Sequence, residues 1–238
     1  MTQNSAAKPS ALGLRAVKLL AGVPAPCLDA LAQECRWRRV LAGQRVISRS
    51  AQDHDVYLIV GGKVRITAFS SAGRQVTYRD IGTGDWFGDL AAIDGGSRSA
   101  DVDALDDTLL ASMTPTLFRR LLHDHPVVCD RVLDRLAALV RDLTERVFEF
   151  STLGVQNRVH AELLRLAREA GVQGNSARID PAPRHSDIAG KVSSYREQVT
   201  RELSTMAKQG LVARSGRALV IPDVDRLERI VSEVRRLA

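Results

Sequence analysis

Trp86-Phe87-Gly88-Asp89-Leu90-Ala91-Ala92-Ile93-Asp94-Gly95-Gly96-Ser97-Arg98-Ser99-Ala100 is the stretch of this 238-residue chain that says most about its fold. It brings a carboxylate, glycines, an arginine and a hydroxyl together in one short element. Residues 90–92 favour a short helix after Gly88, and we expect Arg98 and Ser99 to lie across from the start of that helix.

This combination suits a small anionic ligand. A phosphate needs N–H donors from a turn or a helix start, together with a guanidinium whose fork matches its oxygens. Asp89 repels phosphate but can accept hydrogen bonds from a sugar hydroxyl, so the stretch could hold a nucleotide by sugar and phosphate together. The alternative is a β-turn-β connection with an ordinary surface arginine.

The sequence around this stretch predicts an antiparallel β-roll. Short β-type runs at 56–60, 64–69 and 75–78 are separated by turn residues. Gly61-Gly62 is a candidate hairpin, and Ser70-Ser71-Ala72-Gly73 is a second turn. The mouth of such a roll can enclose one small ligand.

A long helix is expected next, because residues 126–152 contain no glycine and only the starting proline. Apolar residues recur there at intervals of four and three, as on a coiled-coil seam; they are Val132, Leu136, Leu139, Leu143, Val147 and Phe150. This pattern predicts a dimerisation helix. A single amphipathic helix lying on its own domain is the alternative.

The last third predicts a winged helix-turn-helix. Helices are expected over 156–170, 184–190, 194–209 and 224–237, with a β-hairpin formed by 211–214 and 217–221. The short turn 191–193 joins the second and third helices, and either Ser193 or Ser194 is expected to cap the third.

The third of these helices has a face suited to DNA. Val199 and Leu203 should point inward, which leaves Tyr195, Arg196, Gln198 and Arg201 outside near its start. Arg196 can donate two hydrogen bonds to guanine, and Glu197 can accept one from the amino group of cytosine. An ordinary solvated charged face is the alternative.

Charge and cysteine usage support this division. The chain has 34 Lys and Arg against 28 Asp and Glu, and residues 153–238 hold 15 against 10, so most of the excess of +6 lies in the last third. Such a basic region favours a polyanionic partner.

Cys27, Cys35 and Cys129 are scattered, so we expect no disulfide framework, zinc site or iron–sulfur cluster, and no metal at His123, His125 and Cys129. No long apolar run or signal-peptide layout is evident, which predicts a cytoplasmic protein without a membrane segment.

An enzyme is disfavoured. Asp85, Asp89, Asp94 and Asp101 cluster around the opening stretch, but no His, Cys or Lys is placed as an obvious partner. Acidic residues beside β-turns are usually turn formers.

From about Leu28 onward the chain resembles the CRP/FNR family of bacterial transcription regulators. Phe87-Gly88-Asp89-Leu90-Ala91 with Arg98-Ser99-Ala100 is similar to the family's phosphate-binding cassette. Ile188-Ala189, Val192 and Arg196-Glu197-Gln198-Val199-Thr200-Arg201 are similar to its recognition helix.

The resemblance implies the site residues. The cyclic nucleotide would contact Gly88, Asp89, Leu90, Ala91, Arg98, Ser99, Leu143 and Thr144. DNA would contact Ser194, Tyr195, Arg196, Glu197, Gln198, Arg201, Arg214 and Arg217. The chain departs from the family twice: Asp89 replaces a glutamate that contacts the ribose, and Leu143 replaces one of two hydroxyl residues that contact the base.

The sequence therefore predicts an α+β protein of four parts. They are a disordered N-terminus (1–12), a cyclic-nucleotide-binding-like β-roll (13–125), a coiled-coil dimerisation helix (126–152) and a winged helix-turn-helix domain (153–238). The expected function is that of a homodimeric transcription regulator, controlled by cAMP or cGMP, which binds double-stranded DNA at a palindrome with TGTGA-like half-sites. The resemblance adds RNA polymerase as a partner and gives no support for haem.

Two other functions stay open. One is a ligand-independent regulator of the same type with a degenerate cassette, and the other is a nucleotide-binding module that acts on a protein partner. In the ligand-controlled regulator, by contrast, the ligand would shift an equilibrium between two orientations of the DNA-binding domains, with a hinge near 151–155, where Gly154 interrupts the helix.

Overall fold

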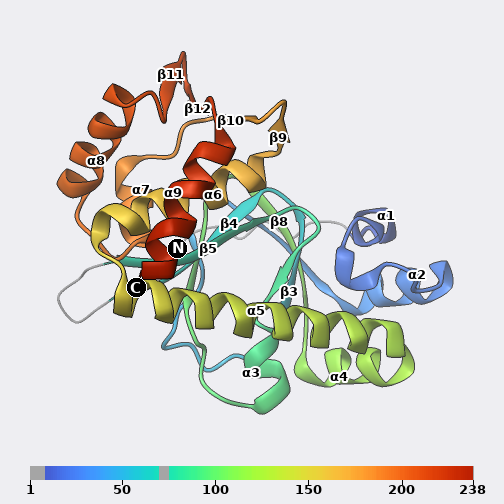
Figure 1. Cartoon of the computed structure of the whole chain (residues 1–238). Helices are drawn as coiled ribbons and strands as arrows, with labels where there is room; N and C mark the ends of the chain where they lie inside the picture. The colour runs from blue at the N-terminus through green and yellow to red at the C-terminus, as the bar shows by residue number, and fades with distance from the viewer. Residues whose placement is uncertain (1–8, 70–74, 238) are drawn as a thin grey trace. The chain divides into compact units, whose positions relative to one another are not determined.

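The computed structural model describes residues 9–69 and 75–237 and divides into two compact units, Met1–Leu139 and Val140–Ala238. Helix α5 (Pro126–Thr152) runs from the first unit into the second as one uninterrupted helix (Figure 1). Its bounds match the helix that the sequence predicts, since proline is accepted in the first turn and Gly154 follows its end. The α+β class with its β-roll, long helix and helix-turn-helix is confirmed.

Among its described residues, the first unit combines eight strands with short helices. The helices are α1 (Ala11–Arg15), the 3₁₀ turn η1 (Lys18–Leu20), α2 (Ala25–Glu34), α3 (Asp89–Asp94) and α4 (Pro115–Asp124). The strands are β1 (Arg36–Val40), β2 (Arg45–Ile47), β3 (Val56–Gly61), β4 (Lys63–Phe69), β5 (Gln75–Gly82), β6 (Trp86–Phe87), β7 (Asp101–Ala104) and β8 (Thr108–Met113).

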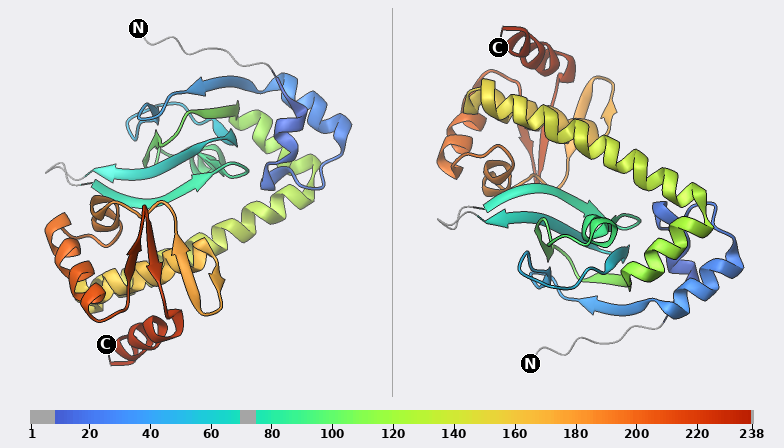
Figure 2. Two further views of the ribbon diagram at one scale, coloured as in Figure 1. Left: turned by 90° about the horizontal axis from the view of Figure 1, so that it is seen from above. Right: turned by 90° about the horizontal axis from the view of Figure 1, so that it is seen from below.

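These strands form two antiparallel sheets, with the orders β1-β8-β3-β6 and β2-β7-β4-β5. Together they make the predicted roll, and α1, α2 and α4 gather at one end of it (Figures 1 and 2). One core fills the interior of the roll around Ile59, Phe87 and Leu110. A second core lies under the helices and includes Leu58, Phe118 and Val132.

The Gly61-Gly62 hairpin prediction is wrong. Strands β3 and β4 follow each other in the chain but pair in different sheets, so the two glycines carry the chain from one sheet to the other. Gly62 has φ +91°, and a Cβ there would lie 2.5 Å from the Thr108 hydroxyl. The alternation pattern shows that strands are present, but not which sheet each one joins.

Two further sequence expectations fall partly or wholly outside the described residues. The turn at Ser70-Ser71-Ala72-Gly73 lies outside them, although the flanking strands pair antiparallel from Phe69 to Gln75. Of the predicted disordered segment 1–12, residues 1–8 lie outside. Helix α1 already begins at Ala11, with the Ser10 hydroxyl accepting from the Gly13 N–H, so the prediction is wrong at its C-terminal end.

The second unit is built from helices beside a four-stranded sheet. The helices after α5 are α6 (Val155–Ala170), α7 (His185–Lys191), α8 (Arg196–Lys208) and α9 (Val224–Leu237). The strands are β9 (Val172–Gln173), β10 (Ser176–Ile179), β11 (Ala213–Ser215) and β12 (Ala218–Ile221), in the order β11-β12-β10-β9. Strands β9 and β10 occupy a region that the sequence suggested to be mostly loop.

Helix α8 packs as its spacing predicts. Val199, Leu203 and Met206 are buried in the core of the second unit, one turn apart along the helix. The hairpin β11–β12 follows, and Gly216 at its tip has φ +60°. The helix-turn-helix and its wing are therefore present as predicted.

Candidate functional site

Arg98 is the best-anchored side chain of the opening stretch. Its side chain is buried, with Arg98 3% exposed, and it donates four hydrogen bonds to three acceptor atoms. Nε and Nη2 donate to Asp53 Oδ1 at 3.1 and 3.0 Å, Nη1 to the Gly88 carbonyl at 3.1 Å and Nη2 to the Asp55 carbonyl at 2.9 Å. A guanidinium has five N–H groups, so one N–H of Nη1 has no acceptor among the described residues. The bond to Gly88 places Arg98 across from the start of α3, as predicted.

Asp53 was not singled out by sequence reasoning. Its side chain is 46% exposed, and its second oxygen, Oδ2, accepts from the Tyr57 hydroxyl at 2.9 Å. The Tyr57 ring stacks on Phe87 with centroids 5.1 Å apart. Burial, and then the hydrogen bond to Asp53, raise the pKa of Tyr57 to about 12, so its hydroxyl is a donor at neutral pH. The half-exposed Asp53 carboxylate thus binds both the Arg98 guanidinium and the Tyr57 hydroxyl.

Gly88 is required by the close approach of Arg98. It has φ +87°, and a Cβ at this position would lie 2.6 Å from the Asp55 carbonyl oxygen and 2.8 Å from Arg98 Nη1. Only glycine adopts this backbone conformation without strain. The glycine therefore lets the start of α3 lie directly against the guanidinium.

Asp89 is turned toward the protein interior. It is 6% exposed, and its Oδ2 accepts from the indole Nε1–H of Trp86 at 3.1 Å. The guanidinium of Arg135 in α5 lies over the face of the same indole, 4.0 Å from the ring centroid, and donates to the Trp86 carbonyl at 2.6 Å. Burial lowers the pKa of Arg135 to about 10, still well above neutral pH. The carboxylate expected to contact ribose is thus also the anchor of a tryptophan stacked on α5.

The remaining predicted ligand residues differ in exposure. Leu90 and Ser99 are exposed and Ala91 is buried, all three beside the Arg98 anchor in sequence. Leu143 is 44% exposed on α5, and the neighbouring Thr144 donates its hydroxyl to the Val140 carbonyl at 2.9 Å. Both lie past Leu139, in the second compact unit.

Helix α5 carries an exposed apolar stripe. Leu133, Val140 and Val147 are 58%, 62% and 64% exposed at seven-residue spacing, with Leu143 and Phe150 beside them. This differs from the predicted seam at its start, because Val132 is 3% exposed and belongs to the core of the first unit. The four-three pattern includes Val132 because the first turns of α5 also bury a face against their own domain, whereas the predicted Leu143, Val147 and Phe150 are exposed.

The end of α5 is held within the second unit by buried charges. Glu149, 4% exposed, accepts from Arg165 of α6 at 3.1 Å and from Arg235 of α9 at 2.6 Å. Glu162 pairs with Lys191 at 3.2 Å and with Arg165. The Glu149 pairs join the two sides of the predicted hinge at 151–155, and the Glu162 pairs lie beyond it.

The turn before α8 corrects one detail of the sequence prediction. Helix α8 begins at Arg196 with Tyr195 as its N-cap, and no side chain caps it. Ser194 is buried and its hydroxyl donates to Gln198 Oε1 at 2.6 Å, while Ser193 has φ +53°. The expected serine cap is therefore wrong: Ser193 is used to make the turn and Ser194 lies one residue too early.

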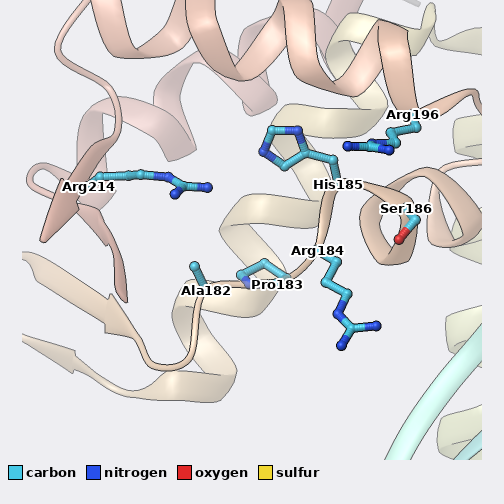
Figure 3. Close-up of a pocket in the computed structure, with 7 residues that line it drawn as sticks. All are labelled: Ala182, Pro183, Arg184, His185, Ser186, Arg196 and Arg214. Carbon is cyan, nitrogen blue, oxygen red and sulfur yellow. The ribbon is translucent and has the colours of Figure 1, made fainter. Parts of the chain in front are cut away.

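The other predicted DNA-contacting residues lie on the surface. Tyr195, Arg196, Glu197 and Arg201 are exposed and Gln198 is half-buried. On the wing, Arg214 and Arg217 are exposed, and Arg217 pairs with Asp180 of the loop after β10 at 2.8 Å. Arg184 and His185, which sequence reasoning did not single out, line a pocket with Arg196 and Arg214 (Figure 3).

Other classes of site find no support in the part of the chain that the structure describes. There, no three His, Cys, Asp or Glu side chains come together as metal ligands. The three cysteines are free, and burial, followed by the charge of Glu34, raises the pKa of Cys35 to about 12. Within residues 9–69 and 75–237, no helix has the length and apolar character needed to cross a membrane.

Comparison with known families gives two matches in tandem. Residues 37–125 match the cyclic nucleotide-binding domain, and residues 157–230 match the Crp-like helix-turn-helix domain. The first range contains the Arg98 anchor and the second contains α7, α8 and the wing.

Similar proteins carry both parts. A CRP-like cAMP-activated global transcriptional regulator of Mycobacterium tuberculosis is 27% identical over 209 residues, which are 87% of this chain and 93% of that protein. The cyclic AMP receptor protein of Thermus thermophilus is 29% identical over 74% of this chain and 78% of its own length. Among solved structures, FixK2 from Bradyrhizobium japonicum has a TM-score of 0.69 at 22% identity, covering 82% of this chain and 96% of FixK2, a likeness of fold.

Proposed function

Since the chain belongs to the CRP/FNR family of DNA-binding transcription regulators, we propose that it is a homodimer whose binding to DNA is controlled by a cyclic nucleotide, cAMP or cGMP. The main support for this proposal is that one chain contains both the buried Arg98, bonded to Gly88, and the exposed helix α8 of a helix-turn-helix. The proposal assigns no enzymatic activity. As a DNA-binding regulator it would work in the cytoplasm, where a bacterial chromosome lies.

The ligand would bind at the outer side of Arg98. The unused N–H of Nη1 and the exposed Ser99 hydroxyl supply donors for a cyclic phosphate, and Asp53 would give up its place on the guanidinium to a second phosphate oxygen. Charge-assisted bonds between guanidinium and phosphate are strong enough to replace a half-exposed carboxylate. The ribose would compete with Trp86 for Asp89.

Dimerisation would use the exposed stripe of α5. Leu133, Val140 and Val147 repeat every seven residues, as the core positions of a two-stranded coiled coil do. Such a dimer would present two α8 helices to two half-sites of a palindrome. Arg196, Glu197 and Arg201 would contact bases, and TGTGA-like half-sites are the proposed target. RNA polymerase is the proposed protein partner at a promoter.

A second candidate is a regulator of the same family that needs no ligand. Specific observations favour it: Arg98 already has a carboxylate partner, Asp89 already has an indole partner, and Leu143 offers the base no hydroxyl.

One experiment separates the candidates. DNA sites are first selected from a random duplex library, and the affinity of the purified protein for the selected site is then measured by fluorescence anisotropy without nucleotide, with cAMP and with cGMP. A coupling of ~1 to 3 kcal/mol changes DNA affinity about 5- to 150-fold. Equal affinity under all three conditions would refute control by a cyclic nucleotide and support the ligand-independent regulator. Failure to select any DNA site would refute sequence-specific DNA binding.

A further inference from the structure

A cationic pocket opens beside the recognition helix. Its volume is about 460 Å³, and it is lined by Ala182, Pro183, Arg184, His185, Ser186, Arg196 and Arg214. The lining comes from three places: the start of α7, the start of α8 and strand β11 of the wing. None of the seven lining residues is acidic, so the positive charge of the pocket is not neutralised from within its own wall.

His185 occupies the middle of this pocket. Figure 3 shows its imidazole between the guanidinium groups of Arg196 and Arg214, both of which point toward it. These two groups, from α8 and β11, are the charges that face the imidazole, and Arg184 precedes it in the chain. Burial, and then the charges of Arg214 and Arg196, lower the pKa of His185 below its ordinary value, so the free protein holds it neutral at neutral pH.

The hydrogen bonds of His185 fix where its proton lies. Thr200 donates its only hydroxyl hydrogen to the Arg196 carbonyl at 2.9 Å. The same hydroxyl oxygen lies 2.7 Å from His185 Nδ1. While Thr200 donates to Arg196, its oxygen is free to accept, which favours the tautomer that carries the proton on Nδ1. In the neutral ring, Nε2 is then a bare acceptor, on the side that Figure 3 shows turned toward Arg214.

An anion in the pocket would favour the protonated form of His185 over the neutral one. An oxygen of a phosphate would meet a lone pair on neutral Nε2, but a donor on the protonated ring. The two arginines that disfavour the imidazolium in the free protein would be neutralised by the same phosphate. Anion binding and proton uptake at Nε2 therefore favour each other.

We propose that this pocket holds a backbone phosphate of DNA, and that His185 takes up a proton at Nε2 as the phosphate enters, so that DNA affinity increases as the pH falls. The proposal rests on the proposed function, which lays the start of α8 and the wing on DNA. It favours a DNA phosphate over a free anion because Arg196 and Arg214 are exposed on those two elements.

The direction of the pH effect follows from linkage. The bound state has the higher His185 pKa, so the extra affinity is complete below the free-state pKa, which lies under 6.5. It is lost as the pH rises through the bound-state pKa. A backbone phosphodiester stays ionised throughout this range, so the histidine is the titrating partner.

The test measures DNA affinity from pH 5.5 to 8.5 at constant ionic strength for the wild type, His185→Gln, His185→Arg and the control His123→Gln, which changes an exposed histidine of α4. The probes are a duplex with two TGTGA half-sites and a random duplex of equal length, each with and without cAMP. DNA affinity should increase as the pH falls from 8.5 to 5.5, and the increase should be roughly tenfold larger for the wild type and H123Q than for H185Q. A tenfold difference corresponds to a rise of about one unit in the pKa of His185 on DNA binding. H185R should bind tightly with the same shallow slope as H185Q.

A second measurement follows the proton directly. NMR titration of the His185 ring should show a higher pKa with duplex DNA than without it, and the nitrogen that gains the proton should be Nε2. Equal pH slopes in wild type and H185Q, or a pKa raised by inorganic sulfate but not by DNA, would overturn the proposal. Absence of DNA binding at every pH by every variant would instead refute the proposed function.

Discussion

Arg98 and Asp53 lie 45 residues apart in the chain and meet at 3.0 Å, where one carboxylate oxygen accepts from two N–H groups of the guanidinium. The pair is asymmetric: Arg98 is 3% exposed and Asp53 is 46% exposed. The buried partner is fixed by two backbone carbonyls, so the exposed partner is the one that can leave.

Removing this carboxylate should strengthen nucleotide binding. Asp53→Asn keeps the size of the side chain and an acceptor for Tyr57 but removes the charge that competes with phosphate. We expect cAMP or cGMP to bind up to about tenfold more tightly, equivalent to ~1.4 kcal/mol, which is a modest effect because the pair is half-exposed. Isothermal titration calorimetry measures the affinity.

The control for this variant is Asp106→Asn, which removes one negative charge from an exposed loop of the same unit. It should leave the affinity unchanged. Weaker binding by D53N than by D106N would mean that Asp53 orients Arg98 for the ligand and does not compete with it.

Asp89 should matter for stability as well as for the ligand. In Asp89→Ala, the buried indole N–H of Trp86 loses its acceptor, which costs about 1–3 kcal/mol of unfolding free energy. Asp89→Asn retains an acceptor and should lose less. Urea denaturation followed by circular dichroism compares the two variants, and equal destabilisation would show that the charge near Arg135, and not the hydrogen bond, is what the site needs.

Arg196 should read one base pair. Arg196→Ala is expected to weaken binding to the selected DNA site by ~1 to 3 kcal/mol and to relax specificity at a single position of each half-site. Repeating the site selection with the variant measures both effects. The control Arg229→Ala removes an exposed arginine from α9 of the same unit; if it reproduced the loss, net charge rather than base contact would explain the result.

The exposed stripe of α5 should hold the dimer together. Val140→Glu places two like charges across the seam of a symmetric coiled coil, which costs several kcal/mol. We expect the dissociation constant of the dimer to rise at least a hundredfold by sedimentation equilibrium. Ala138→Glu adds the same charge off the stripe and should leave the dimer intact, whereas a V140E protein that stayed dimeric would exclude this seam.

The sequence predicted the features that depend on local spacing. Helix α5 and the buried face of α8 follow from periodicity, and the turn at Gly88 follows from glycine beside a short helix former. Features that depend on distant partners were not predictable. Nothing near Arg98 in the sequence points to Asp53, and nothing near Gly61-Gly62 shows that the chain changes sheets there.

Errors of one or two residues arose where two physical demands meet. Val132 fits a coiled-coil seam by spacing but is buried in the core of its own unit, because the first turns of α5 pack against that core. Ser194 has the chemistry of a helix cap, yet it precedes the cap position and bonds to Gln198 instead. His185 carries no recognisable motif, and its role depends on Arg196 and Arg214 meeting in space.

The fluorescence of the Trp86 indole can report changes around Asp89 without an added label. The chain has two tryptophans, and the other, Trp37, donates to the Ala32 carbonyl in the interior of the first unit. Trp86 donates to the Asp89 carboxylate and stacks on Arg135 of α5. In a Trp37→Phe protein, the emission spectrum of Trp86 would therefore report in real time a sugar hydroxyl that takes Asp89 from the indole, or a shift of α5 against it.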